Sequence, residues 1–269
     1  MLEMVVCVKQ VPDATEVRID PQTGSLIRAG VPSIMNPFDA HALEAAVQLK
    51  EQLGGRVTAI SMGPPQAEAV LRKALSMGAD RAILLTDRAF AGSDTLATSY
   101  ILGQAIKKLQ QERPVDLVFC GKHAIDGDTA QVGPGLAVRL NFTQLTYIIK
   151  IEEVNLQERY IQVHRKLEGR REVVRGRLPA LLTVERELNE PRYASLPALI
   201  QAMKAPITVW GKDDLEVDPS RIGLKGSPTS VRRMFAPPQR EGGEILPGSP
   251  REAALALVKK LVESNILSG

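Results

Sequence analysis

Glycine and polar residues are concentrated between Cys120 and Pro134, in the segment CGKHAIDGDTAQVGP. The apolar run VDLVFC ends at the start of this segment and a helical pattern follows it, so the segment joins a buried strand to a helix. The start of a helix presents N–H groups that bind phosphate or ribose oxygens, and Thr129 and Gln131 add polar side chains. Glycines that let a backbone approach a ligand closely are spaced along it: Gly121, Gly127 and Gly133. The pattern predicts an anion or nucleotide site; the simpler alternative is an ordinary strand-to-helix turn.

Other kinds of chemistry find less support in the residue types. The chain lacks both GxxxxGK[ST] and GxGxxG, the two general nucleotide fingerprints. Asp126 and Asp128 have the right ligand type for Mg²⁺, but paired acids in a turn more often cap a helix. His123 has no nucleophile beside it in the sequence. The 2 cysteines, Cys7 and Cys120, exclude a disulfide framework and a four-cysteine zinc site, and we interpret them as small core residues.

Charge and composition narrow the class of protein further. Lys and Arg number 34 and Asp and Glu 31, a net charge of +3, and aromatic residues make up only 4%, which argues against a nucleic-acid partner. We expect no membrane span, because no apolar run approaches ~18 residues. The start, MLEMVVCVKQ, lacks a basic region and a cleavage site, so it does not resemble a signal peptide. These features predict a reduced, cytoplasmic α/β protein.

The elements that must position the 120–134 segment alternate between strands and helices. Apolar runs predict strands over Met4–Val11, Arg56–Met62, Arg81–Thr86 and Val115–Cys120. Helical patterns follow them, from Asn36 and Pro37 to Gly54 and over Gln66–Ser76, Asp94–Gln111 and Thr129–Leu140. This alternation predicts a doubly wound, mostly parallel, Rossmann-like sheet, whose ligands bind beyond the carboxyl ends of the strands. The loops expected at that edge are Val8–Pro12, Met62–Pro65, Asp87–Asp94 and Gly121–Pro134.

The pattern changes after about residue 146. Antiparallel strands are expected over Tyr147–Val154, Tyr160–Lys166 and Val173–Arg177, with a further apolar run over Ala180–Val184. A small hairpin is expected from Val17–Ile19 and Leu26–Ile27. Residues 211–250 are rich in Pro, Gly and Asp, which predicts an extended arm before an amphipathic helix over Arg251–Leu267. We therefore divide the chain into a nucleotide-binding α/β domain, 1–210, and a C-terminal arm and helix, 211–269.

Several motifs together resemble the β subunit of electron transfer flavoproteins. They are VHRKLEGRREVVRGRLPALLT at 163–183, CVKQVPD at 7–13, NPFDAHALEAA at 36–46, SMGPPQ at 61–66, ALSMGAD at 74–80 and LNEPRYASLP at 188–197. The resemblance covers nearly the whole chain. It implies a heterodimer with a larger α subunit, which the C-terminal arm embraces, and an adenine nucleotide held by the strand-end loops.

The resemblance also distinguishes two branches of that family. The loop AIDGDTAQVGP at 124–134 and FAGSDTLAT at 90–98 look like the electron-bifurcating branch, in which FAD replaces AMP and NADH donates a hydride. Ordinary members typically read AIDDDCNQTGQ, so Gly127 replaces an acidic residue and leaves room for a pyrophosphate. Ser93 stands where the bifurcating branch usually has alanine. The cofactor-binding residues implied are Cys7, Val8, Asn36, Phe38, Asp39, Met62, Gly63, Asp94, Thr95, Gly121, Ile125, Asp126, Gly127, Asp128, Thr129, Gln131, Val132, Gly133 and Pro134.

The implied electron acceptors are the α-subunit FAD, followed by an acyl-CoA dehydrogenase or a quinone-linked acceptor, and ferredoxin or flavodoxin. The motif LNEPRYASLP resembles the loop that docks acyl-CoA dehydrogenases, with Leu196 as its anchor. The implied partner-binding residues are Leu188, Asn189, Glu190, Pro191, Arg192, Tyr193 and Leu196. One alternative is a non-bifurcating subunit with structural AMP. Another is a stand-alone nucleotide-binding module of the stress-protein type, against which the arm and the docking-like loop argue.

Overall fold

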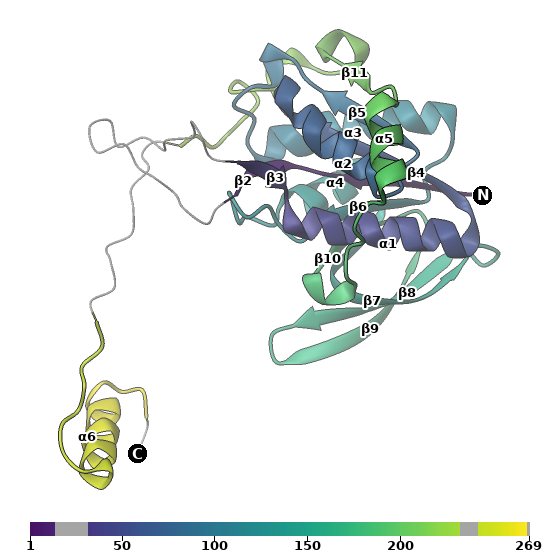
Figure 1. Cartoon of the computed structure of the whole chain (residues 1–269). Coiled ribbons are helices and arrows are strands. Elements are labelled where there is room, and N and C mark those ends of the chain that lie inside the picture. Colours follow the sequence, from purple (N-terminus) through teal and green to yellow (C-terminus); the bar gives the residue numbers. More distant parts are fainter. Residues whose placement is uncertain (14–31, 232–241, 268–269) are drawn as a thin grey trace. The chain divides into compact units, whose positions relative to one another are not determined.

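The computed structural model describes residues 1–13, 32–231 and 242–267. It forms two compact units, residues 1–233 and residues 234–269. The first unit carries a central sheet covered by helices, and the second carries a helix, α6 (Pro250–Glu263) (Figure 1). Among the described helices, none is long and apolar enough to cross a membrane.

The central sheet of the first unit has nine strands in the order β11-β5-β4-β1-β6-β10-β7-β8-β9. Every pairing from β11 to β7 is parallel, whereas β7, β8 and β9 pair antiparallel. The strands are β1 (Leu2–Cys7), β4 (Gly55–Met62), β5 (Arg81–Leu85), β6 (Leu117–Gly121), β7 (Thr143–Asn155), β8 (Tyr160–Leu167), β9 (Arg170–Arg177), β10 (Ala180–Val184) and β11 (Thr208–Trp210). The predicted mostly parallel sheet with an antiparallel addition is confirmed.

Helices cover both faces of this sheet, as a parallel sheet requires. Along β1, Met4 and Val6 point into a core shared with α1 (Pro37–Leu53) and α2 (Glu68–Ser76). Val5 and Cys7 point the other way, into a core shared with α3 (Thr95–Glu112) and α4 (Val132–Leu140). The alternation follows from the two-residue period of a strand.

The order in which the chain adds strands to the sheet changes direction at β1. It passes from β1 through α1 to β4 and through α2 to β5, and then returns by α3 to β6 on the other side of β1. A parallel sheet opens a crevice at such a point, outside the carboxyl ends of its strands. The loops that follow β1 and β6 lie at this edge of the sheet, and the 120–134 segment follows β6.

Two expected elements differ from the structure. The run Met4–Val11 is not one strand: β1 ends at Cys7, and β2 (Gln10–Pro12) pairs antiparallel with β3 (Ser33–Met35) in a separate sheet. The helix expected from Thr129 begins only at Val132, because Asp128 and Ala130 adopt positive φ, 52° and 54°, which a right-handed helix excludes. The hairpin expected within residues 17–27 lies outside the described residues.

Residues beyond 187 add a helix and an edge strand to the first unit. Helix α5 (Leu196–Lys204) packs against α2, and β11 extends the sheet beside β5. Leu215 and Ile222 are buried in the core on the α3 face. The start of the expected arm is therefore part of the first unit, which continues past residue 210 to Arg233.

Candidate functional site

The residues implied by the nucleotide-site motifs gather at the carboxyl edge of the sheet. Cys7, Met62 and Gly121 are the last residues of β1, β4 and β6, and Val8 and Gly63 directly follow β1 and β4. Asn36, Phe38 and Asp39 lie at the start of α1, Asp94 and Thr95 at the start of α3, and Ile125, Asp126, Gly127, Asp128, Thr129, Gln131, Val132, Gly133 and Pro134 in the β6–α4 loop and the first turn of α4. Some of these residues hold the loops in place, and others face solvent.

Asn36 and Asp39 are buried and hold the two loops in place. The Asn36 side-chain amide donates to Asp39 Oδ1 at 2.9 Å and to the His123 carbonyl at 2.9 Å, while its oxygen accepts from the Ile125 N–H at 3.2 Å. Asp39 accepts from the Gly121 N–H at 3.1 Å and from the Lys9 N–H at 2.8 Å. The start of α1 therefore fixes the backbone directly after both β1 and β6.

The buried position of Asp39 changes the pKa of its carboxyl group. Burial raises its pKa to about 7, although hydrogen bonds from Asn36 and from the N–H groups of Lys9 and Gly121 favour the charged form. Asn36 and Asp39, which the resemblance assigns to the cofactor, thus make their hydrogen bonds within the chain. Both side chains therefore act on the shape of the β6–α4 loop.

The two acidic side chains of the loop also have partners within the chain. Lys9 Nζ lies 2.7 Å from Asp126 Oδ1 and 2.8 Å from Oδ2. His123 Nδ1 lies 2.7 Å from Asp128 Oδ1, and the His123 ring meets Phe38 edge-on at 4.4 Å between centroids. The described residues contain no group of three or more His, Cys, Asp or Glu side chains arranged to hold a metal ion. The sequence did not assign Lys9 to the candidate site. Its position directly after an apolar strand, in CVKQVPD, was the signal that could have placed it there.

The three glycines of the segment have different surroundings. A Cβ on Gly121 would lie 2.4 Å from Asp39 Oδ1, and one on Gly133 would lie 2.4 Å from Thr183 Cγ2. These two glycines are needed for close packing within the chain, not for a ligand's approach. A Cβ on Gly127 would have no neighbour within 4 Å, so this exposed position alone borders open space.

The segment from Gly127 to Gly133 contains residues with strained backbone angles and backbone N–H groups that are free to donate. Asp128 and Ala130 hold positive φ without being glycine, a costly conformation that is concentrated at functional sites. Helix α4 starts at Val132, and the Gln131 side chain does not cap it, so its first N–H groups have no partner within the helix. Gln131 Oε1 instead accepts from the Thr95 hydroxyl at 3.0 Å, which ties the start of α4 to the start of α3.

Asp94 is engaged in capping and packing. Its Oδ1 accepts from the N–H groups of Leu96 and Ala97 at 2.9 and 3.0 Å, as an N-cap does. Its Oδ2 accepts from the Thr229 hydroxyl at 2.8 Å and from the Thr229 N–H at 3.1 Å. Asp94 is therefore the N-cap of α3.

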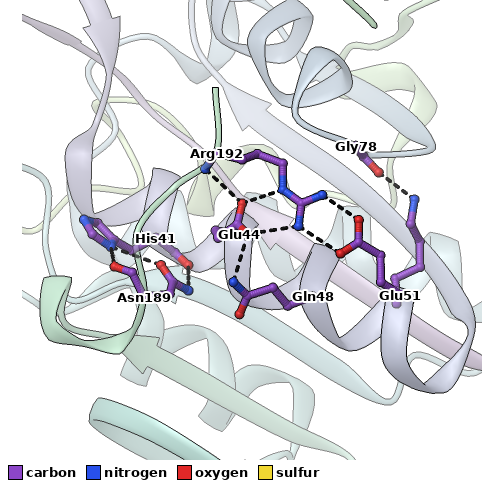
Figure 2. A network of polar contacts seen from close by, with 8 residues as sticks. His41, Glu44, Gln48, Glu51, Gly78, Asn189 and Arg192 are labelled. Carbon is purple, nitrogen blue, oxygen red and sulfur yellow. Dashed lines mark hydrogen bonds and ion pairs between the residues drawn. The ribbon is translucent and has the colours of Figure 1, made fainter. Parts of the chain in front are cut away.

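Asn189 and Arg192, two of the residues assigned to partner binding, belong to a second cluster that extends along α1 from His41 to Glu51 (Figure 2). The Asn189 side chain donates to the His41 carbonyl at 3.0 Å, and His41 Nδ1 lies 2.8 Å from the Asn189 carbonyl. Arg192 contacts Glu44 and Glu51, two carboxylates of α1 that the sequence analysis did not single out. Asn189 and Arg192 therefore attach their segment to α1 instead of pointing away from it.

Apolar side chains beside this attachment are exposed. Tyr193 is 97% exposed and Leu196, the first residue of α5, is 70% exposed. Leu199, Ile200 and Met203 continue the exposed set along α5 at helical spacing, at 43%, 49% and 70%. We call these five residues the α5 patch. Leu196 thus begins a helix but does not pack inward, and large apolar groups in such a patch mark interaction surfaces.

Comparison with known proteins gives a consistent result. The family model described as electron transfer flavoprotein domain matches residues 23–215. The chain is 49% identical over 268 residues to the caffeyl-CoA reductase-Etf complex subunit CarD of Acetobacterium woodii, covering 99% of this chain and 100% of that protein. It is 50% identical over 267 residues to the electron transfer flavoprotein subunit beta of Thermoanaerobacterium thermosaccharolyticum, covering 99% and 100%. It is also 50% identical over 256 residues to protein FixA of Bradyrhizobium diazoefficiens, covering 94% and 89%.

Proposed function

The chain belongs to the electron transfer flavoprotein β-subunit family, and from that premise we propose that it binds FAD at the β6–α4 loop as one half of a bifurcating heterodimer. When bound, FAD would accept a hydride from NADH and return its two electrons singly, one to the α-subunit FAD and one to ferredoxin or flavodoxin. The part of this chain is to place the cofactor and to select the partners.

The observation that carries the proposal is the open position at Gly127 in front of the start of α4. An empty space beside a backbone, followed by N–H groups without helical partners at Val132 and Gly133, fits the phosphates of a dinucleotide. Thr129 is exposed in the same loop, and its hydroxyl would add a further donor. Asn36 and Asp39 would keep the loop in shape without touching the phosphates.

Partners are proposed from the second cluster and from the second unit. The relative from Acetobacterium woodii is named as a subunit of a caffeyl-CoA reductase-Etf complex, which supports an enzyme of acyl-CoA oxidation or reduction as the partner here. The α5 patch would dock such an acyl-CoA dehydrogenase, with Leu196 as the anchor. Helix α6, whose Leu255 and Val258 are 64% and 51% exposed, would dock on the α subunit.

The nucleotide content of the purified heterodimer tests this proposal. The chain is co-expressed with its α subunit, and the nucleotides released by denaturation are separated and counted. Two FAD per heterodimer are expected, together with reduction of ferredoxin by NADH when the second acceptor is present. One FAD and one AMP would contradict the bifurcating assignment and support the AMP-binding alternative.

Substitution of Leu196 tests the docking role. Leu196→Ala should raise the KM for an acyl-CoA dehydrogenase about tenfold or more, because a leucine side chain buried in a partner's pocket contributes roughly 1.5–3 kcal/mol. Reduction of the bound flavin by NADH should be unchanged, since Leu196 lies outside the strand-end loops. Equal KM values in variant and wild type would remove Leu196 from the docking surface.

A further inference from the structure

We infer that Arg192 is a positioning residue for partner docking, which acts by locking the α5 patch to helix α1. The inference rests on the proposed docking role of that patch. It assigns to Arg192 no contact with the partner itself.

Arg192 is held by two carboxylates at once (Figure 2). Its Nε donates to Glu44 Oε2 at 2.8 Å and its Nη2 to Glu44 Oε1 at 3.0 Å. Its Nη1 and Nη2 also donate to Glu51 Oε1 and Oε2, at 2.5 and 2.9 Å. The Arg192 backbone N–H donates to Glu44 Oε2 at 3.1 Å, so the main chain is fixed together with the side chain.

The burial of Glu44 makes this attachment rigid. The Glu44 side chain is only 3% exposed, so its charge needs partners within the protein. Gln48 supplies one hydrogen bond at 2.9 Å, and Arg192 supplies the compensating charge. Arg192 also holds the pKa of Glu51 below its usual value through their hydrogen bonds. A lysine could not reproduce this geometry, because an ammonium group lacks the planar fork that pairs with two carboxylates.

The attachment sits directly before the exposed side chains. Tyr193 follows Arg192 in the chain and is almost fully exposed, and helix α5 begins three residues further on, at Leu196. Asn189, paired with His41, holds the segment on the other side of Pro191. At the far end of α5, Arg72 Nη1 donates to the Ala202 and Ala205 carbonyls at 2.7 and 2.5 Å. The patch is thus held at both ends, and Arg192 holds the end that carries Tyr193 and Leu196.

A surface held in this way loses little conformational freedom when a partner docks, and a looser one binds more weakly. Arg192→Lys should keep a positive charge near Glu44 but lose the double fork. We expect the KM for the acyl-CoA dehydrogenase to rise about tenfold with kcat within about twofold of wild type. Flavin content and reduction by NADH should not change.

The experiment uses the co-expressed heterodimer and four variants. Arg192→Lys and Leu196→Ala are made singly and together, and Arg81→Lys is the matched control, since Arg81 forms a similar ion pair with Glu112 away from the patch. Amide hydrogen exchange over residues 193–204 is measured beside KM and kcat. Faster exchange in Arg192→Lys but not in Arg81→Lys is expected. In the double variant, KM should rise by less than the product of the two single increases, because Arg192 acts on docking through the position of Leu196.

Each other outcome has a definite meaning. Unchanged amide exchange in Arg192→Lys overturns the positioning role whatever happens to docking. Faster exchange with an unchanged KM shows that docking does not depend on the attachment and also overturns it. Effects that multiply in the double variant show that Arg192 affects docking independently of Leu196, which overturns its role in positioning the patch. If Leu196→Ala leaves KM unchanged, the docking role under the proposed function fails, and the inference that rests on it fails with it; exchange data from Arg192→Lys distinguish that case from a failure of the attachment alone.

Discussion

Replacing Gly127 by aspartate should weaken nucleotide binding to this subunit without unfolding it. A Cβ at Gly127 meets no atom within 4 Å, and no positive φ demands glycine there. The new side chain therefore costs little in the folded protein itself. Its carboxylate would stand where the proposed phosphates approach the loop, so the effect of the substitution would fall on binding.

The size of the effect follows from the exposure of the position. Two like charges about 4 Å apart repel by about 1 kcal/mol in water and about 4 kcal/mol at an effective dielectric constant of 20. Gly127 is exposed, so the lower part of this range applies, at about 1–2 kcal/mol. At about 1.4 kcal/mol for each factor of ten, FAD should bind roughly 5- to 30-fold more weakly.

Gly127→Asn separates charge from bulk, because asparagine has nearly the same size and no charge. The assay is the flavin content of the heterodimer after dialysis, with the α-subunit flavin as internal reference, at low and high salt. The aspartate variant should lose flavin from the β subunit, less so at high salt, where the repulsion is screened. Full occupancy in Gly127→Asp, or equal loss in the asparagine variant, would refute the phosphate assignment of this loop.

Three further predictions concern packing, pH and assembly. Gly133→Ala should lower stability by about 1–3 kcal/mol, measured by denaturant titration, because its Cβ would collide with Thr183, whereas Gly127→Ala should not. The buried Asp39 has its pKa raised to about 7 when folded, so its contribution to stability is full below about pH 4 and is lost as the pH rises to about 7. Denaturation midpoints measured between pH 4 and 8 should therefore fall more steeply in the wild type than in Asp39→Asn. Deleting residues 234–269 should leave the first unit with an unchanged melting temperature but abolish co-purification with the α subunit; a heterodimer that survives would contradict the role of α6.

The sheet could be predicted from local sequence because its strands are long apolar runs punctuated by helix signals. Asn36 and Pro37 mark the start of α1, and Asp94 marks that of α3. The strand β11 escaped prediction because a three-residue edge strand carries almost no periodicity. The late start of α4 escaped it because nothing in the residue types reveals that Asp128 and Ala130 adopt positive φ.

The sequence predicts the candidate site only as a region at the strand ends, because long-range pairing decides what each side chain does. The family resemblance implies that Asn36 and Asp39 bind a ligand, yet they bind the backbone of residues more than 80 positions away, as the separation of 82 between Asp39 and Gly121 shows. The same holds for Arg192, whose partner Glu44 is 148 positions earlier. A single sequence carries no signal of such pairs.

Helix α1 connects the two surfaces that the proposed function requires. Its first turn fixes the loops after β1 and β6 through Asp39, and its middle and last turns hold the α5 patch through Glu44 and Glu51. Between those contacts its apolar face is buried against the sheet, with Ala42, Leu43 and Ala46 completely covered. A helix packed in this way cannot shift at one end without the other, because close-packed side chains transmit displacement. The distance between the proposed nucleotide loop and the proposed docking surface is therefore set by one rigid element.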